Sequence, residues 1–283
     1  MLKQRVITAL VLLAILLPAL FWRTPEPFLA ITLLLLAAGG WDWGRLNGLE
    51  QGASLGLGAL TLALCAGAWA LGWTQAPSVL LWSAVGAAWV LAGAALVRAG
   101  VDGWPRIPRA LRVPGGVLAL ALAWVAMAQA RVIGVNFLLS ILVLVWVADI
   151  FADFAGRAIG GRFTQRKLAP LISPKKSWEG VWGGMAGVVV LAVAWALADS
   201  ATHAQVPSLY TRLAGLGWPV VVVASIFLAA MSVVGDLTES LVKRSAGFKD
   251  SSQLLPGHGG VLDRVDALLP TLPLAMMLAT LAR

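Results

Sequence analysis

The residues best suited to chemistry are carboxylates at the ends of three long apolar stretches. They are Asp149 near the end of one stretch, Asp236 and Glu239 at the end of a second, and Asp263 and Asp266 at the start of a third. Ionisable groups inside apolar spans are costly and are usually functional. Clustered carboxylates suit Mg²⁺, which binds a few of them together with substrate phosphates. The pattern indicates one acidic cluster that handles phosphate groups.

Each acidic group also has a purely structural interpretation. Asp153 and Arg157 follow Asp149 at intervals of four residues, which fits a charge ladder at a helix end. Lys243 could pair with either acid of the second group. Acids in the first turn of a helix favour its dipole, which would account for the third group. These alternatives remain open from the sequence alone.

A basic segment precedes the seventh apolar stretch. Ser173 and Pro174 predict the N-cap and first residue of a helix. Lys175 and Lys176 would then lie in its first turn, where cations oppose the helix dipole. That placement predicts a bound phosphate, held by free backbone N–H groups and two ammonium groups. An anchor for anionic lipid headgroups is the alternative, and both can hold together.

A glycine-rich turn, Gly257-His258-Gly259-Gly260, stands directly before Asp263. Glycines allow left-handed backbone and close approach, which can turn successive N–H groups toward an anion. The chain has no GxxxxGK[ST] motif, so this is not a Walker A loop. We interpret the turn as part of the same phosphate site.

The composition places the chain in the membrane class. Its residues are 60% hydrophobic and only 12% charged, whereas soluble domains carry roughly 25% charged residues. We predict an all-α, polytopic transmembrane bundle, with a short second span that ends in an interfacial Trp41-Asp42-Trp43. The nine expected spans are 6–22, 28–44, 54–73, 78–97, 113–130, 133–154, 180–198, 218–238 and 262–281.

The distribution of basic residues predicts the orientation. With the N-terminus in the cytoplasm, seventeen of the 21 Lys and Arg residues fall on the cytoplasmic side. The loops 155–179 and 239–261 then share that side, in a catalytic region 131–283 that follows membrane helices in 1–130. The net charge of +8 lies in short loops between apolar stretches, which argues against a nucleic-acid partner.

The run from Ser240 to Asp266 contains S-x-x-K-R-x4-K-D followed by P-x-H-G-G-x-x-D-R-x-D. This pattern resembles the signature of the phosphatidate cytidylyltransferase family, and the segments KLAP…SPKKSWEG and GDLTES resemble it too. The resemblance covers about residues 145–266. One departure is Asp149-Ile-Phe-Ala-Asp153, where the family commonly has Asp-Thr-Gly-Ala-Tyr, and the segment near 160–166 is also longer.

The resemblance implies a dimeric bacterial inner-membrane enzyme that joins CTP to phosphatidate at the cytoplasmic face. It implies Mg²⁺ as cofactor, with a second, monovalent cation such as K⁺ as an option. The metal ligands would be Asp236, Asp263 and Asp149, and the catalytic residues Asp236, Asp263, Lys243 and Lys176. The substrate-binding residues would be Lys167, Ser173, Lys175, Ser177, Glu239, Ser240, Arg244, Lys249, Asp250, His258, Gly259, Gly260, Arg264 and Asp266.

Three other functions compete with this one. A CDP-alcohol phosphatidyltransferase would need a DGxxAR…GxxxD cluster, which the sequence lacks. A CTP-dependent lipid-alcohol kinase would release CDP rather than pyrophosphate. A transporter would need charges at mid-membrane with access from both sides, whereas these acids gather at one face.

Overall fold

The computed structural model describes residues 2–282, and every regular element in that range is helical. Nine helical stretches there are long and apolar enough to cross a membrane, as predicted. The helices are α1 (Leu2–Leu20), α2 (Glu26–Leu46), α3 (Gln51–Ala70), α4 (Val79–Ala99), a 3-10 turn η1 (Trp104–Arg106), α5 (Arg109–Ile133), α6 (Val135–Ile159), α7 (Trp178–Thr202), α8 (Leu209–Ala214), α9 (Trp218–Ser245), α10 (Leu262–Val265) and α11 (Leu268–Leu281).

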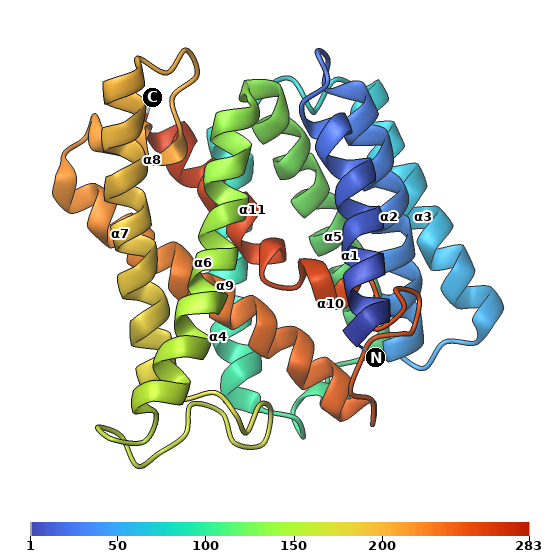
Figure 1. Ribbon diagram of the computed structural model, residues 1–283. Helices are drawn as coiled ribbons and strands as arrows, with labels where there is room; N and C mark the ends of the chain where they lie inside the picture. The colour runs from blue at the N-terminus through green and yellow to red at the C-terminus, as the bar shows by residue number, and fades with distance from the viewer. Residues whose placement is uncertain (1, 283) are drawn as a thin grey trace.

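The two ends of the bundle differ in what they carry (Figure 1). The start of α1, the α6–α7 loop and the segment after α9 lie at one end, and α8 and the C-terminal end of α11 lie at the other. This arrangement fits an odd number of crossings. It also gathers the two polar loops of residues 131–283 on one side, as the sequence predicts.

Small residues set the contact between α6 and α7. A Cβ at Gly184 would lie 2.7 Å from the carbonyl oxygen of Ala148, and one at Gly180 would lie 2.9 Å from that of Ala152. Glycines four residues apart let two membrane helices approach until their backbones touch. α7 packs in turn against α9, so α6, α7 and α9 form one wall of helices.

The polar end of α2, predicted to be interfacial, packs inside the protein. Asp42 is fully buried and Trp43 is 9% exposed. The indole Nε1 of Trp43 donates to the carbonyl oxygen of Val113 on α5 at 3.1 Å. Trp43 and Asp42 therefore have polar partners inside the protein.

The helix start predicted at Ser173 and Pro174 is wrong. α7 begins at Trp178, because the hydroxyl of Ser177 caps it by accepting from the Gly180 N–H at 3.2 Å. Ser173 lies instead in a turn, where its N–H donates to the carbonyl oxygen of Ala169 at 2.8 Å. Lys175 and Lys176 therefore precede the helix rather than forming its first turn.

The last two spans depart from the expected boundaries as well. α9 continues to Ser245, since Leu241 and Val242 stay buried beyond the last apolar run. The loop after it is correspondingly shorter than 239–261. The ninth span is not one helix but breaks between Val265 and Leu268, at Asp266. Broken helices are tolerated at membrane depth only where protein or a polar site surrounds them.

Candidate active site

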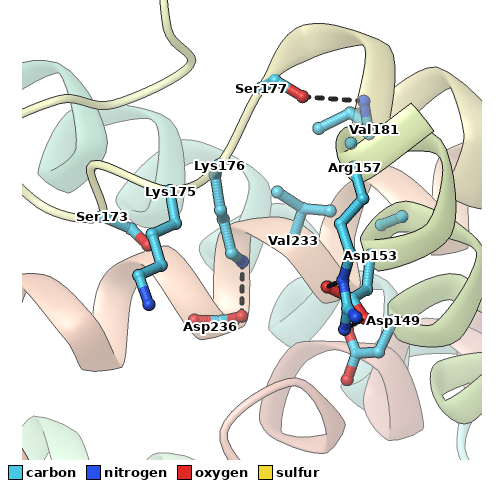
Figure 2. A pocket seen from close by; sticks show the side chains of 13 residues that line it. Asp149, Asp153, Arg157, Ser173, Lys175, Lys176, Ser177, Val181, Val233 and Asp236 are labelled. Atoms are coloured by element: carbon cyan, nitrogen blue, oxygen red, sulfur yellow. Dashed lines mark hydrogen bonds and ion pairs between the residues drawn. The ribbon is translucent and has the colours of Figure 1, made fainter. Parts of the chain in front are cut away.

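A cavity of about 590 Å³ lies between α6, α7, α9 and the α6–α7 loop. Lys176 extends toward Asp236, and Asp149 and Asp153 lie across from them beside Arg157 (Figure 2). Asp149 comes from α6 and Asp236 from α9, while Lys175 and Lys176 come from the loop. The cavity therefore has groups of both signs that a metal–phosphate ligand requires.

Lys176 and Asp236 form an ion pair within this cavity (Figure 2). Both side chains are about one quarter exposed, at 26% and 27%. The hydroxyl of Ser240, one turn further along α9, donates to Asp236 at 3.2 Å. Asp149 is close enough to both members of the pair to interact with their charges. The pair is thus accessible, and a ligand can reach it.

The α6–α7 loop is held in place by Glu179, a residue that the sequence analysis missed. Its carboxylate is fully buried and accepts from the N–H groups of Phe163 and Thr164, at 3.1 and 2.7 Å. Lys167 donates to the carbonyl oxygen of Pro174 at 2.6 Å within the same loop. These contacts fix the backbone from which Lys175 and Lys176 extend.

A second polar cluster lies further along α9 and is closed to solvent. Lys243 contacts Glu239 at 2.5 Å and Asp263 at 2.6 Å. The three side chains are 12%, 3% and 4% exposed. One lysine therefore neutralises two buried acids, and together they join α9 to the start of α10.

Asp263 also anchors the glycine-rich loop. Its Oδ2 accepts from the N–H of Ser251 at 2.9 Å, from the Ser251 hydroxyl at 2.8 Å and from the N–H of Gly260 at 2.7 Å. Gly257 and Gly259 have φ of +77° and +84°, the left-handed geometry that was predicted. The Gly260 N–H donates to Asp263, so it is not free to donate to a phosphate as the glycine-rich turn was predicted to do.

Helices α1 and α2, from the N-terminal part of the chain, hold the same loop. Arg5 donates to the carbonyl oxygen of Gly257 at 2.8 Å, and Thr8 donates to that of Pro256 at 2.9 Å. Asp42, on α2, accepts from the Leu262 N–H at 3.0 Å and the Ser251 hydroxyl at 3.2 Å. The sequence did contain a signal for Asp42, since it is an acid inside an apolar stretch. The interfacial interpretation of Trp41-Asp42-Trp43 kept Asp42 out of the predicted site.

Asp266 lies at the break between α10 and α11. Its carboxylate accepts from the N–H of Ala267 at 2.8 Å, and its charge interacts with those of Asp236 and Asp149. The carbonyl oxygen of Asp266 would lie 2.5 Å from a Cβ at Gly235, so α9 and the break are in close contact. Of the acids predicted to form one cluster, Asp149, Asp236 and Asp266 interact through their charges, whereas Glu239 and Asp263 pair with Lys243.

Comparison with known proteins decides the family. The profile of the Cytidylyltransferase family matches residues 3–282. The chain belongs to this family. A Pseudomonas aeruginosa protein named phosphatidate cytidylyltransferase is 40% identical over 277 residues, which cover 96% of this chain and 95% of that protein. A Haemophilus influenzae protein of the same name is 36% identical over 96% of both chains. The resemblance predicted from the sequence is confirmed.

The predicted site residues divide into groups. The cavity contains Asp149, Ser173, Lys175, Lys176, Ser177 and Asp236. Glu239, Lys243, Gly259, Gly260 and Asp263 belong instead to the loop anchor, and the side chain of Asp153 pairs with Arg157 as a helix-end ladder. Outside both groups, the structure leaves Arg244, Lys249, Asp250 and Arg264 exposed, and His258 half-buried.

The carboxylates fit a magnesium site that is completed by substrate. Within residues 2–282, no three acid, histidine or cysteine side chains form a ready-made metal site. Mg²⁺ does not require one, because it commonly binds through one or two carboxylates plus phosphates and water. Asp236 and Asp149 line the open cavity and suit that role. Both oxygens of Asp263 already have donors, so its part as a direct ligand stays a prediction.

Proposed function

We propose that this chain transfers the cytidylyl group of CTP to phosphatidate, forming CDP-diacylglycerol and pyrophosphate. One observation carries the proposal: an open cavity in which Lys175 and Lys176 face Asp236 and Asp149 at one end of the bundle. Two relatives that match this chain over 96% of its length are named phosphatidate cytidylyltransferase, and these names support the same reaction.

The reaction needs no nucleophile from the protein. An oxygen of the phosphatidate phosphate attacks the α-phosphorus of CTP, and the bond from that phosphorus to the β-phosphate bridging oxygen breaks. A phosphate monoester has its second pKa near ~6, so it is already an anion at neutral pH. The obstacle is the repulsion between two polyanions, and positioning and charge neutralisation remove it.

The residues of the cavity divide this work. Lys175 and Lys176 bind phosphate oxygens and neutralise the departing pyrophosphate. Asp236 and Asp149 would hold Mg²⁺, and a second, monovalent cation such as K⁺ would accompany it. The chemistry that Mg²⁺ supplies when bound is neutralisation of the CTP phosphates and polarisation of the α-phosphorus. Lys176 occupies a cation position at Asp236 and can move to the incoming phosphates.

The location follows from the same arrangement. We place the chain in the bacterial inner membrane with its N-terminus and cavity in the cytoplasm, because seventeen of 21 basic residues then lie inside. The lipid tails remain in the bilayer beside α6, whose Phe151 and Phe154 are 47% and 65% exposed. A homodimer is proposed from the family resemblance.

The test is a direct assay of the purified chain in mixed micelles with phosphatidate and CTP labelled at the α-phosphate. The proposal predicts label in the lipid and release of pyrophosphate, both dependent on Mg²⁺. Diacylglycerol in place of phosphatidate is the matched control and should yield no labelled lipid. Release of CDP with an unlabelled lipid phosphate would show a lipid kinase instead.

A further inference from the structure

A second, smaller cavity of about 200 Å³ lies where α2 ends, α5 begins and the segment after α9 starts. It shares no lining residue with the larger cavity. Asp236 lines the larger one and Ser245 lines this one, and their separation of nine residues along α9 corresponds to roughly 13 Å along its axis. The two cavities are therefore separate sites on the same side of the bundle.

Three arginines line the second cavity: Arg45, Arg109 and Arg112. No acid lines it, and none of the three arginines forms a salt bridge within residues 2–282. Arg109 and Arg112 are close enough for their charges to repel each other. They also stand in the first turn of α5, where positive charge opposes the helix dipole. A bound anion would stabilise this concentration of positive charge.

Buried polar groups at the same cavity lack partners. Trp104 is 5% exposed, and its indole N–H has no acceptor in the described structure. The Nε of Arg112 likewise has none. Unsatisfied buried donors are rare in folded proteins and need an explanation, such as a bound water, ion or ligand. The Arg112 guanidinium lies over the aromatic ring of Trp104, 5.3 Å from the ring centroid, and this contact orients the guanidinium.

We propose that this cavity binds a phosphate ester, with Arg109 and Arg112 as its principal ligands. Guanidinium groups match phosphate oxygens with paired hydrogen bonds, and Arg is the residue best suited to that geometry. An apolar side chain stands beside the arginines, since Phe248 lines the same cavity and is 45% exposed. A headgroup phosphate of an anionic phospholipid satisfies both features, and a soluble phosphate ester satisfies the first.

The site differs from the cavity proposed for catalysis and does not depend on the proposed function. Its backbone neighbours connect it to the glycine-rich loop, because Phe248 follows α9 and leads toward Ser251. Asn47, which lines the cavity, lies one helical turn from Trp43 and just beyond the end of α2. A ligand in this cavity would therefore lie beside the end of α2 and beside the segment after α9 that leads into the glycine-rich loop.

Lipid retention by the purified full-length chain tests the proposal. Native mass spectrometry of the protein in detergent, titrated with phosphatidylglycerol, should show one retained lipid whose binding weakens roughly tenfold or more in Arg109→Gln/Arg112→Gln. Arg106→Gln is the matched control, since Arg106 is exposed in the same segment and outside the cavity. Phosphatidylcholine, which has no net charge, should bind weakly to all three proteins.

Two further arms make the result decisive. Displacement of the lipid by millimolar inorganic phosphate would identify the phosphate group alone as the ligand feature, whereas retention would identify a phospholipid. Trp104→Phe removes the indole N–H with part of the ring, keeps an aromatic face and changes no charge, so it should weaken binding while both arginines remain in place. The proposal would be overturned if the wild-type chain, the Arg109→Gln/Arg112→Gln double variant and Trp104→Phe all retained phosphatidylglycerol equally. Lys176→Gln should leave this lipid bound, which separates it from lipid in the catalytic cavity.

Discussion

Asp42 on α2 accepts a hydrogen bond from the backbone N–H of Leu262 at 3.0 Å, across a sequence separation of 220 residues. The same carboxylate oxygen accepts from the hydroxyl of Ser251 at 3.2 Å. A Cβ at Gly260 would overlap both Asp42 and Ser251. The N-terminal helices thus take a direct part in shaping the loop that carries the family signature.

Asp42→Ala should therefore loosen that loop. The change leaves the Leu262 N–H and the Ser251 hydroxyl without their buried acceptor, at a cost of about 1–3 kcal/mol. We expect a lower Tm in detergent and faster proteolysis between residues 246 and 261. Asp102→Ala is the control, because Asp102 is exposed and should tolerate the change. Equal Tm and cleavage for both variants would contradict this role.

Lys243→Met should be among the most destabilising single changes in the chain. It leaves Glu239 and Asp263, both nearly inaccessible, without their shared cation. Breaking a buried ion pair from one side costs about 3–5 kcal/mol. Thermal unfolding in detergent measures the effect. Adding Glu239→Gln to Lys243→Met should recover part of the loss, and an Arg244→Gln control should change little, since Arg244 is exposed.

Gly259→Ala and Gly247→Ala form a matched pair. Both glycines have positive φ, of +84° and +77°, so each alanine pays about 1–2 kcal/mol for left-handed backbone. Only at Gly259 would the new Cβ also meet Asp263, at 2.6 Å, whereas Gly247 faces open space. Gly259→Ala should consequently lose much more activity than Gly247→Ala. Similar activities in the two variants would mean that the close approach of Gly259 to Asp263 does not matter for activity.

Lys176→Met should lower kcat/KM for CTP roughly 100-fold or more, because it removes a cation from the phosphate site. Arg166→Gln provides the comparison, since Arg166 is exposed on the same loop and does not line the cavity. Initial rates at varied CTP measure both. A loss confined to KM for phosphatidate would assign Lys176 to the lipid phosphate rather than to the nucleotide.

Much of the architecture was predictable because membrane spans obey simple length and polarity rules. The nine spans and the gathering of acids at one end both follow from apolar runs interrupted by carboxylates. The sequence could not assign Asp42 or Glu179, because their partners are backbone N–H groups distant in the chain, which no local pattern reports. The break at Asp266 was missed for a related reason, since apolar residues continue across it.

The start of α7 shows the limit of capping rules. Ser173-Pro174 and Ser177-Trp178 are both acceptable helix starts by residue type. The turn closed by Ala169 and Ser173 uses up the backbone groups that an earlier helix would need. Tertiary contacts therefore decide between two local signals of similar strength, and they leave both lysines in the loop.

The role of Asp236 is the central claim, and the rate of cytidylyl transfer by Asp236→Asn tests it most directly. The measurement is incorporation of α-labelled CTP into phosphatidate at saturating Mg²⁺, alongside Asp153→Asn, whose parent residue also lines the cavity but pairs with Arg157. The account predicts a loss of roughly 100-fold or more for Asp236→Asn, with Asp153→Asn close to wild type. Near-normal transfer by a folded Asp236→Asn protein would contradict it.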